Sequence, residues 1–185
     1  MITLIGGGVR CGKSAFALAL ARGLGRKRSF VATAQAFDDE MRARIAAHRA
    51  ERAAEFETLE VPLALPEVLA QLRADVVVID CLTLWLSNLL LADVREHEIG
   101  ARVEALGEAL RAAHFHSVLV TNEVGLGIVP DNALARRFRD CAGRAHQHLA
   151  ALSDQIFFGA LGCMLRLRPA PVCLVRAEEL NVTLD

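Results

Sequence analysis

The stretch Gly7-Gly8-Val9-Arg10-Cys11-Gly12-Lys13-Ser14 stands near the start of the chain and satisfies the pattern G-x-x-x-x-G-K-[ST] in full. An apolar run at residues 2–5 precedes it and predicts a strand, and a helical pattern follows from about residue 13 to residue 24. Glycines let the backbone turn tightly and bring its N–H groups against phosphate oxygens, and the helix adds its positive N-terminal dipole. The stretch therefore predicts a phosphate-binding loop rather than a chance glycine-rich turn.

Two side chains of this loop are expected to act on the phosphates. Lys13 would reach the β- and γ-phosphates of a nucleotide, and the Ser14 hydroxyl would bind Mg²⁺. Lys13 and Lys27 are the only lysines in a chain that otherwise uses arginine. A compact ammonium kept at this place in the loop supports the functional interpretation.

Short apolar runs alternate with longer helical patterns along the rest of the chain. Such alternation predicts βα units with right-handed crossovers, and a mostly parallel sheet covered by helices on both faces. The predicted strands are at residues 29–32, 56–61, 76–79, 117–121 and 155–158, and the predicted helices are at 38–54, 94–113 and 131–152. We therefore expect a single α/β domain of the P-loop NTPase type with a RecA-like arrangement. It would span residues 1–168, and residues 169–185 would form a tail or an edge strand.

Composition argues against several other classes of protein. The 185 residues carry a formal net charge of −1, which does not suit a mainly electrostatic nucleic-acid binder. Five cysteines without a C-x-x-C pair do not suit a zinc site or a disulfide framework. The most apolar later stretch, residues 76–92, is interrupted by polar side chains and is too short for a membrane span, and no signal peptide is evident. We expect a cytoplasmic protein with neither a nucleic-acid partner nor a membrane span.

Asp80 follows the β-branched run at residues 76–79, which is typical of a buried parallel strand. A carboxylate at the end of such a strand is a candidate Walker B residue, which holds Mg²⁺ directly or through water. The alternative is an acidic N-cap of a helix that begins near Leu82. Together with the phosphate-binding loop, Asp80 is better explained by the metal role.

The predicted helix at 38–54 carries a histidine among arginines. Arg44, His48 and Arg52 are spaced four apart and share one helix face. Nearby cations disfavour the imidazolium, so His48 should be a neutral imidazole near pH 7, which is a nucleophile. From the residues alone, a solvated surface histidine remains the simpler interpretation.

Two further groups of polar residues lie where a site would form. Asn122 and Glu123 follow the predicted strand 117–121, and they either face the site or form a hydrogen-bonded loop. Arg136, Arg137 and Arg139 crowd one helical turn, and they either contact phosphate or form a solvated basic face.

These segments together resemble one known family. The matching segments are the phosphate-binding loop, Ala32-Thr33-Ala34-Gln35, Asp38-Asp39-Glu40-Met41, Arg44-Ile45, His48-Arg49, Asp80-Cys81-Leu82-Thr83-Leu84-Trp85, Ser87-Asn88-Leu89, Val120-Thr121-Asn122-Glu123-Val124-Gly125-Leu126-Gly127-Ile128-Val129-Pro130, Ala135-Arg136-Arg137-Phe138-Arg139-Asp140 and Ala142-Gly143-Arg144. They resemble the adenosylcobinamide kinase/adenosylcobinamide-phosphate guanylyltransferase family, in order and without large gaps over about residues 1–168.

The resemblance implies two reactions. In the first, ATP or GTP phosphorylates the aminopropanol hydroxyl of adenosylcobinamide. In the second, GTP donates GMP to that phosphate, which releases pyrophosphate and gives adenosylcobinamide-GDP in cobalamin biosynthesis. In this family the second reaction runs through a guanylylated histidine, and the matching position is His48. The catalytic role of His48 is thus implied by the resemblance, whereas the residues around it alone favour a surface histidine.

The resemblance also implies the nucleotide contacts and the assembly. Lys13 would be catalytic beside His48, Ser14 and Asp80 would hold Mg²⁺, and the protein would be a homotrimer with its site near a subunit boundary. The nucleotide-binding positions would be Gly7, Gly8, Val9, Arg10, Cys11, Gly12, Lys13, Ser14, Thr33, Ala34, Gln35, Arg49, Ala50, Glu51, Arg52, Glu60 and Asp80. Apart from the resemblance, we expect Glu123 to serve as a supporting residue or a base because it follows a strand at the site edge.

The chain departs from the family at four places. Cys11 replaces the usual serine of the loop, a mild change because the backbone N–H groups bind phosphate. Ala53 stands where proline is common, and His146 stands where asparagine is common. Residues 157–162 are also altered. These changes bear on corrinoid docking more than on nucleotide binding.

Two other functions fit a phosphate-binding loop. A P-loop ATPase or GTPase that drives conformational change would use water as acceptor and would not label a histidine. A non-catalytic nucleotide sensor would bind GTP without turnover. The complete set of Lys13, Ser14 and Asp80 argues against the sensor.

Overall fold

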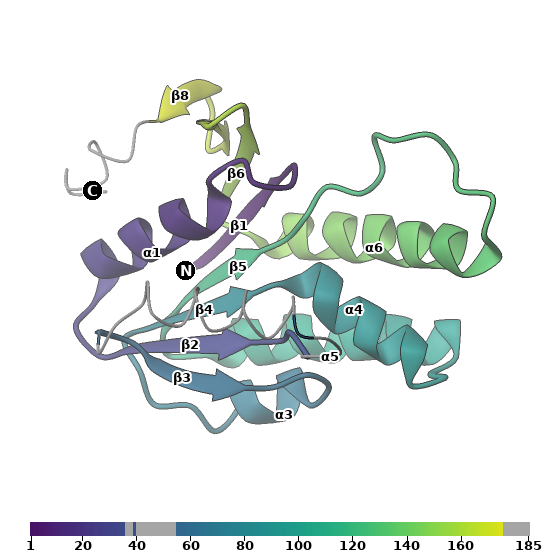
Figure 1. Ribbon diagram of the computed structural model, residues 1–185. Helices are drawn as coiled ribbons and strands as arrows, with labels where there is room; N and C mark the ends of the chain where they lie inside the picture. Colours follow the sequence, from purple (N-terminus) through teal and green to yellow (C-terminus); the bar gives the residue numbers. More distant parts are fainter. Residues whose placement is uncertain (36–38, 40–54, 176–185) are drawn as a thin grey trace.

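The computed structural model describes residues 1–35, 39 and 55–175. Eight strands form one sheet in the order β3-β2-β4-β5-β1-β6-β7-β8 (Figure 1). The first six are parallel, whereas β7 is antiparallel to β6, and β8 is antiparallel to β7. The strands are β1 (Ile2–Gly7), β2 (Arg28–Ala32), β3 (Glu57–Glu60), β4 (Val76–Asp80), β5 (His116–Val120), β6 (Gln155–Ala160), β7 (Cys163–Arg168) and β8 (Cys173–Val175).

Helices cover both faces of the sheet. The helices are α1 (Lys13–Leu24), α3 (Leu65–Leu69), α4 (Leu82–Leu91), α5 (Glu96–Ala112) and α6 (Ala133–Leu152). One buried cluster joins α1 to the sheet and includes Val76 and Val78, and the other joins α3–α6 to the opposite face and includes Val77 and Ile79. Alternate residues of β4 therefore enter different cores, which explains why its sequence is apolar without interruption. The α/β class predicted from the sequence is confirmed.

The predicted elements agree with the described part of the chain in most places. Helix α6 begins two residues later than expected because Asn132 caps it: the Asn132 side chain accepts hydrogen bonds from the N–H groups of Leu134 and Ala135 at 2.8 and 3.2 Å. Helix α1 begins and ends where the sequence placed it. The helix predicted at 38–54 lies outside the described residues apart from Asp39.

Two elements, α3 and β7, were not expected from the sequence, and α4 was considered only as the helix near Leu82 that Asp80 would cap. The structure makes Cys81 the N-cap of α4. Helix α4 has the sequence LTLWLSNLLL, and seven of its ten residues are buried. A helix that is apolar nearly all round lacks the amphipathic period by which helices are recognised. Within the predicted tail or edge strand, residues 173–175 form β8, and residues 176–185 lie outside the description.

Within the described ranges, none of the helices combines the length and the apolar character that crossing a membrane would require.

Candidate active site at the carboxyl ends of the strands

The phosphate-binding loop connects β1 to α1. A side chain on Gly7 would place its Cβ 2.4 Å from the Gly159 carbonyl oxygen, and Gly7 has a φ of +150°. Gly12 has a φ of +94° and precedes the first residue of α1, whose hydrogen bonding starts with the Phe16 N–H donating to the Gly12 carbonyl at 3.0 Å. These two glycines are therefore required by close approach and by backbone conformation. The remaining loop residues, Gly8 to Cys11, form the turn between them.

Lys13 is held inside this loop. Its ammonium donates a hydrogen bond to the Gly8 carbonyl at 2.8 Å, and the residue is only 7% exposed. Ser14 follows it in the first turn of α1 and is partly buried. Cys11 is buried, and its sulfur packs against Gly7 and Gly159. The loop thus brings together a buried ammonium, a hydroxyl and a helix N-terminus, which is the arrangement predicted for phosphate binding.

Asp80 ends β4, two strands from β1 in the sheet. Two strand spacings amount to about 10 Å. Burial raises the pKa of the adjacent Cys81 thiol, the Asp80 carboxylate raises it further, and the Lys13 ammonium opposes both effects. Because β1 and β4 are both parallel to β5, Asp80 and the loop that carries Lys13 lie at the same edge of the sheet.

Thr33 holds the backbone at Asp80 and Cys81, where β4 ends and α4 begins. The Thr33 hydroxyl donates to the Cys81 carbonyl at 2.7 Å and accepts from the Cys81 N–H at 2.9 Å, and the Thr33 N–H donates to the Asp80 carbonyl at 3.2 Å. The Thr33 carbonyl accepts from the Asn88 amide at 2.8 Å. The polar groups of Thr33 are thus engaged within the protein, so this residue positions the Asp80 strand end. Its direct contact with nucleotide stays a prediction.

The end of β5 lies between β4 and β1, and the residues after it are hydrogen-bonded to the segment that follows β4 and to the last residue of β1. The Asn122 amide donates to the Thr83 hydroxyl at 3.1 Å, and the Glu123 N–H donates to the Gly7 carbonyl at 2.9 Å. The Glu123 carboxylate accepts a hydrogen bond from the Gly125 N–H. Of the two sequence interpretations, the structure shows a hydrogen-bonded loop that contacts the phosphate-binding loop through its backbone.

Ala34, Gln35 and Glu60 lie at the far end of the same edge. Ala34 and Gln35 follow β2, and Glu60 ends the outermost strand β3, where it is exposed. Four strand spacings separate β3 from β1, about 19 Å. The structure therefore divides the predicted nucleotide-binding residues into a group around Lys13 and a group on β2 and β3. His48 and residues 49–52, which belong between β2 and β3 in the chain, lie outside the described residues.

The basic turn of α6 contacts carbonyl oxygens. Arg136 donates to the carbonyls of Pro130 and Asp131 at 2.8 and 2.6 Å, and Arg139 donates to the Gly125 carbonyl at 2.7 Å. Arg136 and Arg139 therefore hold the loop between β5 and α6. Arg136 and Arg137 are exposed, as expected of a solvated basic face, and a phosphate contact stays a prediction.

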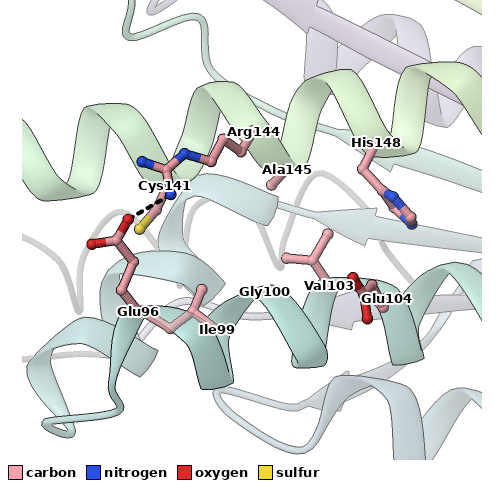
Figure 2. A pocket seen from close by; sticks show the side chains of 9 residues that line it. All are labelled: Glu96, Ile99, Gly100, Val103, Glu104, Cys141, Arg144, Ala145 and His148. Atoms are coloured by element: carbon pink, nitrogen blue, oxygen red, sulfur yellow. Dashed lines mark hydrogen bonds and ion pairs between the residues drawn. The ribbon is translucent and has the colours of Figure 1, made fainter.

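A cavity of about 260 Å³ lies elsewhere, between α5 and α6. Figure 2 shows its lining, with Glu96 and Arg144 paired at one end and Glu104 and His148 at the other. Of the residues assigned to nucleotide binding that the structure describes, none lines it. The candidate site is therefore the strand edge and not this cavity.

Sequence reasoning did not give a role to several buried polar residues that support the site. Asn88 bridges Thr33 and the Pro62 carbonyl, at 2.8 and 3.1 Å, and the Trp85 indole N–H donates to the Leu63 carbonyl at 2.9 Å. The available signal was the presence of polar side chains within the apolar run of α4.

A strand, a glycine-rich turn and a helix that together enclose a buried lysine, with an acidic strand end two strands away, define a P-loop nucleotide-binding protein. The solved structure of the RadB recombinase has the same fold, with a TM-score of 0.52 and 16% sequence identity over 95% of this chain and 86% of that chain. The chain belongs to the cobinamide kinase / cobinamide phosphate guanyltransferase family, whose sequence profile matches residues 3–167.

Two relatives support this assignment. The bifunctional adenosylcobalamin biosynthesis protein CobP of Pseudomonas aeruginosa is 46% identical over 177 residues, which cover 93% of this chain and 100% of the relative. The bifunctional adenosylcobalamin biosynthesis protein CobU of Salmonella typhimurium is 37% identical over 182 residues, which cover 91% of this chain and 100% of the relative. The family resemblance seen in the sequence is confirmed.

Proposed function

We propose that this protein phosphorylates adenosylcobinamide with a nucleoside triphosphate and then transfers GMP from GTP to the phosphate formed, as an enzyme of cobalamin biosynthesis. The observation that carries the proposal is the buried Lys13 ammonium on the Gly8 carbonyl, inside a chain that matches the family over residues 3–167. Bound phosphate oxygens would replace that carbonyl as the partner of Lys13. The names of both relatives support a bifunctional enzyme.

In the kinase step, the loop binds the triphosphate and the corrinoid supplies the acceptor. The bond between the γ-phosphorus and the β,γ-bridging oxygen breaks and the nucleoside diphosphate leaves. A bond from the γ-phosphorus to the corrinoid hydroxyl oxygen forms, and the hydroxyl proton passes to water. Backbone N–H groups of the loop and the Lys13 ammonium stabilise the negative charge of the transferring group. Glu123 supports this arrangement because its N–H holds the Gly7 carbonyl.

Two oxygen-bearing side chains at this edge have the chemistry that suits Mg²⁺. The Ser14 hydroxyl and the Asp80 carboxylate are hard oxygen ligands of the kind that Mg²⁺ takes in small number beside substrate phosphates. We assign them to the metal. The ion would share the charge of the phosphate groups.

For the second reaction we assign the nucleophile to His48. A neutral imidazole would attack the α-phosphorus of GTP and release pyrophosphate, and the corrinoid phosphate would then displace the imidazole and take the GMP. Ala34, Gln35 and Glu60 border the chain segment that contains His48, about 14 to 19 Å along the strand edge from β1. We assign the predicted nucleotide contacts of these three residues to the same GMP transfer, in which the loop holds the triphosphate.

We also propose that the protein is cytoplasmic and assembles into a homotrimer. The exposed apolar side chains of one loop support an interface between copies of the chain. Leu126, Ile128 and Val129 are 84%, 97% and 63% exposed in one loop, and contiguous exposed apolar surface marks interfaces. Sedimentation equilibrium measures the assembly directly, and a monomer at micromolar concentration contradicts it.

The experiment that tests the nucleotidyl transfer is covalent labelling. The protein is incubated with GTP labelled on the α-phosphate in the absence of corrinoid, and acid-labile, base-stable label is measured. Wild type should incorporate label, and His48→Ala should not. His97→Ala is the matched control, because His97 is exposed on α5 and should label normally. Equal labelling of wild type and His48→Ala would falsify the assignment.

A further inference from the structure

Thr121, Asn122 and Glu123 follow β5, and each is hydrogen-bonded to a different part of the site. The Thr121 hydroxyl lies 2.7 Å from Nε2 of His146 on α6, and Thr121 is only 3% exposed. Asn122 and Glu123 are bonded to the corner after β4 and to Gly7, as described above. The segment therefore connects α6, the Asp80 strand end and the phosphate-binding loop.

His146 is the outer member of this chain of contacts. It is partly buried on the side of α6 that also buries Ala142, Ala145 and Leu149 against the sheet. Burial lowers the pKa of His146, and the Glu123 carboxylate opposes that effect. The imidazole is therefore neutral at neutral pH, with one donor and one acceptor nitrogen, and its Nε2 pairs with the Thr121 hydroxyl in either tautomer.

Thr121 transmits this contact to the loop through short links. Its N–H donates to the Ile5 carbonyl at 2.9 Å, and a Cβ on Gly6 would lie 3.8 Å from its methyl carbon. Ile5 and Gly6 are the residues of β1 that lead into Gly7. A shift of Thr121 would therefore move the first glycine of the loop, which binding geometry tolerates poorly.

We propose that His146 is a positioning residue of the phosphate-binding site, which fixes the Thr121 hydroxyl and thereby the strand end that holds Gly7. The inference rests on the proposed function, because it assigns nucleotide binding to the loop. His146 does not touch substrate. It acts through Thr121, and its effect should appear as an energetic coupling between these two residues.

A double-mutant cycle tests the coupling. The dissociation constant of the non-hydrolysable analogue guanosine 5′-(β,γ-imido)triphosphate is measured by calorimetry with Mg²⁺ present. His146→Leu and Thr121→Val remove the hydrogen bond, and each should raise the dissociation constant about three- to tenfold. The double variant should be no weaker than the weaker single variant. His146→Gln should come within about twofold of wild type, because its amide reaches as far as Nε2 does.

The matched control is His148→Leu. His148 lies two residues further along α6, lines the cavity of Figure 2 and is directed toward α5, where its Nε2 would be 3.0 Å from a Cβ on Gly107. It should bind the analogue as wild type does. Thermal unfolding of every variant shows whether it is folded. If His146→Leu does not fold, the dissociation constants of Thr121→Ser, which keeps the hydroxyl, and Thr121→Val, which lacks it, are compared instead.

The outcomes separate the two proposals. A wild-type protein that does not bind the analogue contradicts the proposed function itself. If wild type binds the analogue, two results overturn the positioning role alone. One is a dissociation constant of His146→Leu within twofold of wild type, and the other is a double variant whose dissociation constant rises by the product of the two single effects.

Discussion

The carboxyl edge of the sheet and the cavity between α5 and α6 hold their polar groups in different ways. At the edge, buried residues such as Thr33 and Lys13 bond to backbone carbonyls or N–H groups. In the cavity, Glu96 and Arg144 pair with each other while 41% and 68% exposed. An exposed pair contributes little to stability, whereas a buried polar group needs its partner. The candidate site is therefore distinguished by buried polar groups bonded to the backbone, and not by the volume of a cavity.

Removal of the buried Lys13 ammonium should have the largest effect on the strand edge. Lys13→Ala should lower kcat/KM for phosphoryl transfer to adenosylcobinamide by about 100- to 1,000-fold, because a charge-stabilising donor is lost from the transition state. GMP transfer should be lost as well. Transfer of label from γ-labelled ATP to the corrinoid measures the first effect.

Lys27→Ala is the matched control, since Lys27 is the second of the two lysines and is exposed. It should retain wild-type activity. A kinase rate in Lys13→Ala close to that of Lys27→Ala would show that the loop does not bind the transferred phosphate.

Local signals explain which parts of the molecule could be predicted from sequence. The loop and α1 were predicted because their residues are consecutive and each has a steric or electrostatic reason. The strands β4 and β5 were predicted because burial on both faces leaves an uninterrupted apolar run. Family resemblance supplied the role of His48, which lies outside the described residues, so its position stays a prediction.

The supporting contacts could not be predicted because they join distant residues. Thr33 and Cys81 are 48 residues apart, Thr33 and Asn88 are 55 apart, and Thr121 and His146 are 25 apart. A sequence shows that these side chains are polar, but which of them meet depends on the fold, which pairs β2 with β4 and brings His146 of α6 to Thr121 after β5. The polar side chains within the apolar run of α4 were the available signal, but the helix lacks an amphipathic period that would show which element they contact.

The two regions should also respond in opposite directions when a glycine is replaced by alanine. Gly7→Ala places a methyl group 2.4 Å from the Gly159 carbonyl oxygen and 2.9 Å from the Gly159 nitrogen. Backbone cannot yield as a flexible side chain does, so the free energy of unfolding should fall by about 1 to 3 kcal/mol. Nucleotide binding should weaken with it, because the displaced backbone is that of the loop. Urea denaturation and calorimetric titration with the GTP analogue measure the two effects.

Gly100→Ala is the corresponding change in the lining of the cavity. Gly100 lies within α5, and a Cβ at that position meets nothing within 4 Å, so the added methyl enters open space. Alanine loses less backbone entropy than glycine when a helix forms, and the free energy of unfolding should therefore rise by about 0.5 to 1 kcal/mol. Both catalytic activities should stay at wild-type values. Destabilisation by Gly100→Ala would contradict the open space at that position, and a loss of GMP transfer would mean that the cavity is coupled to the strand edge.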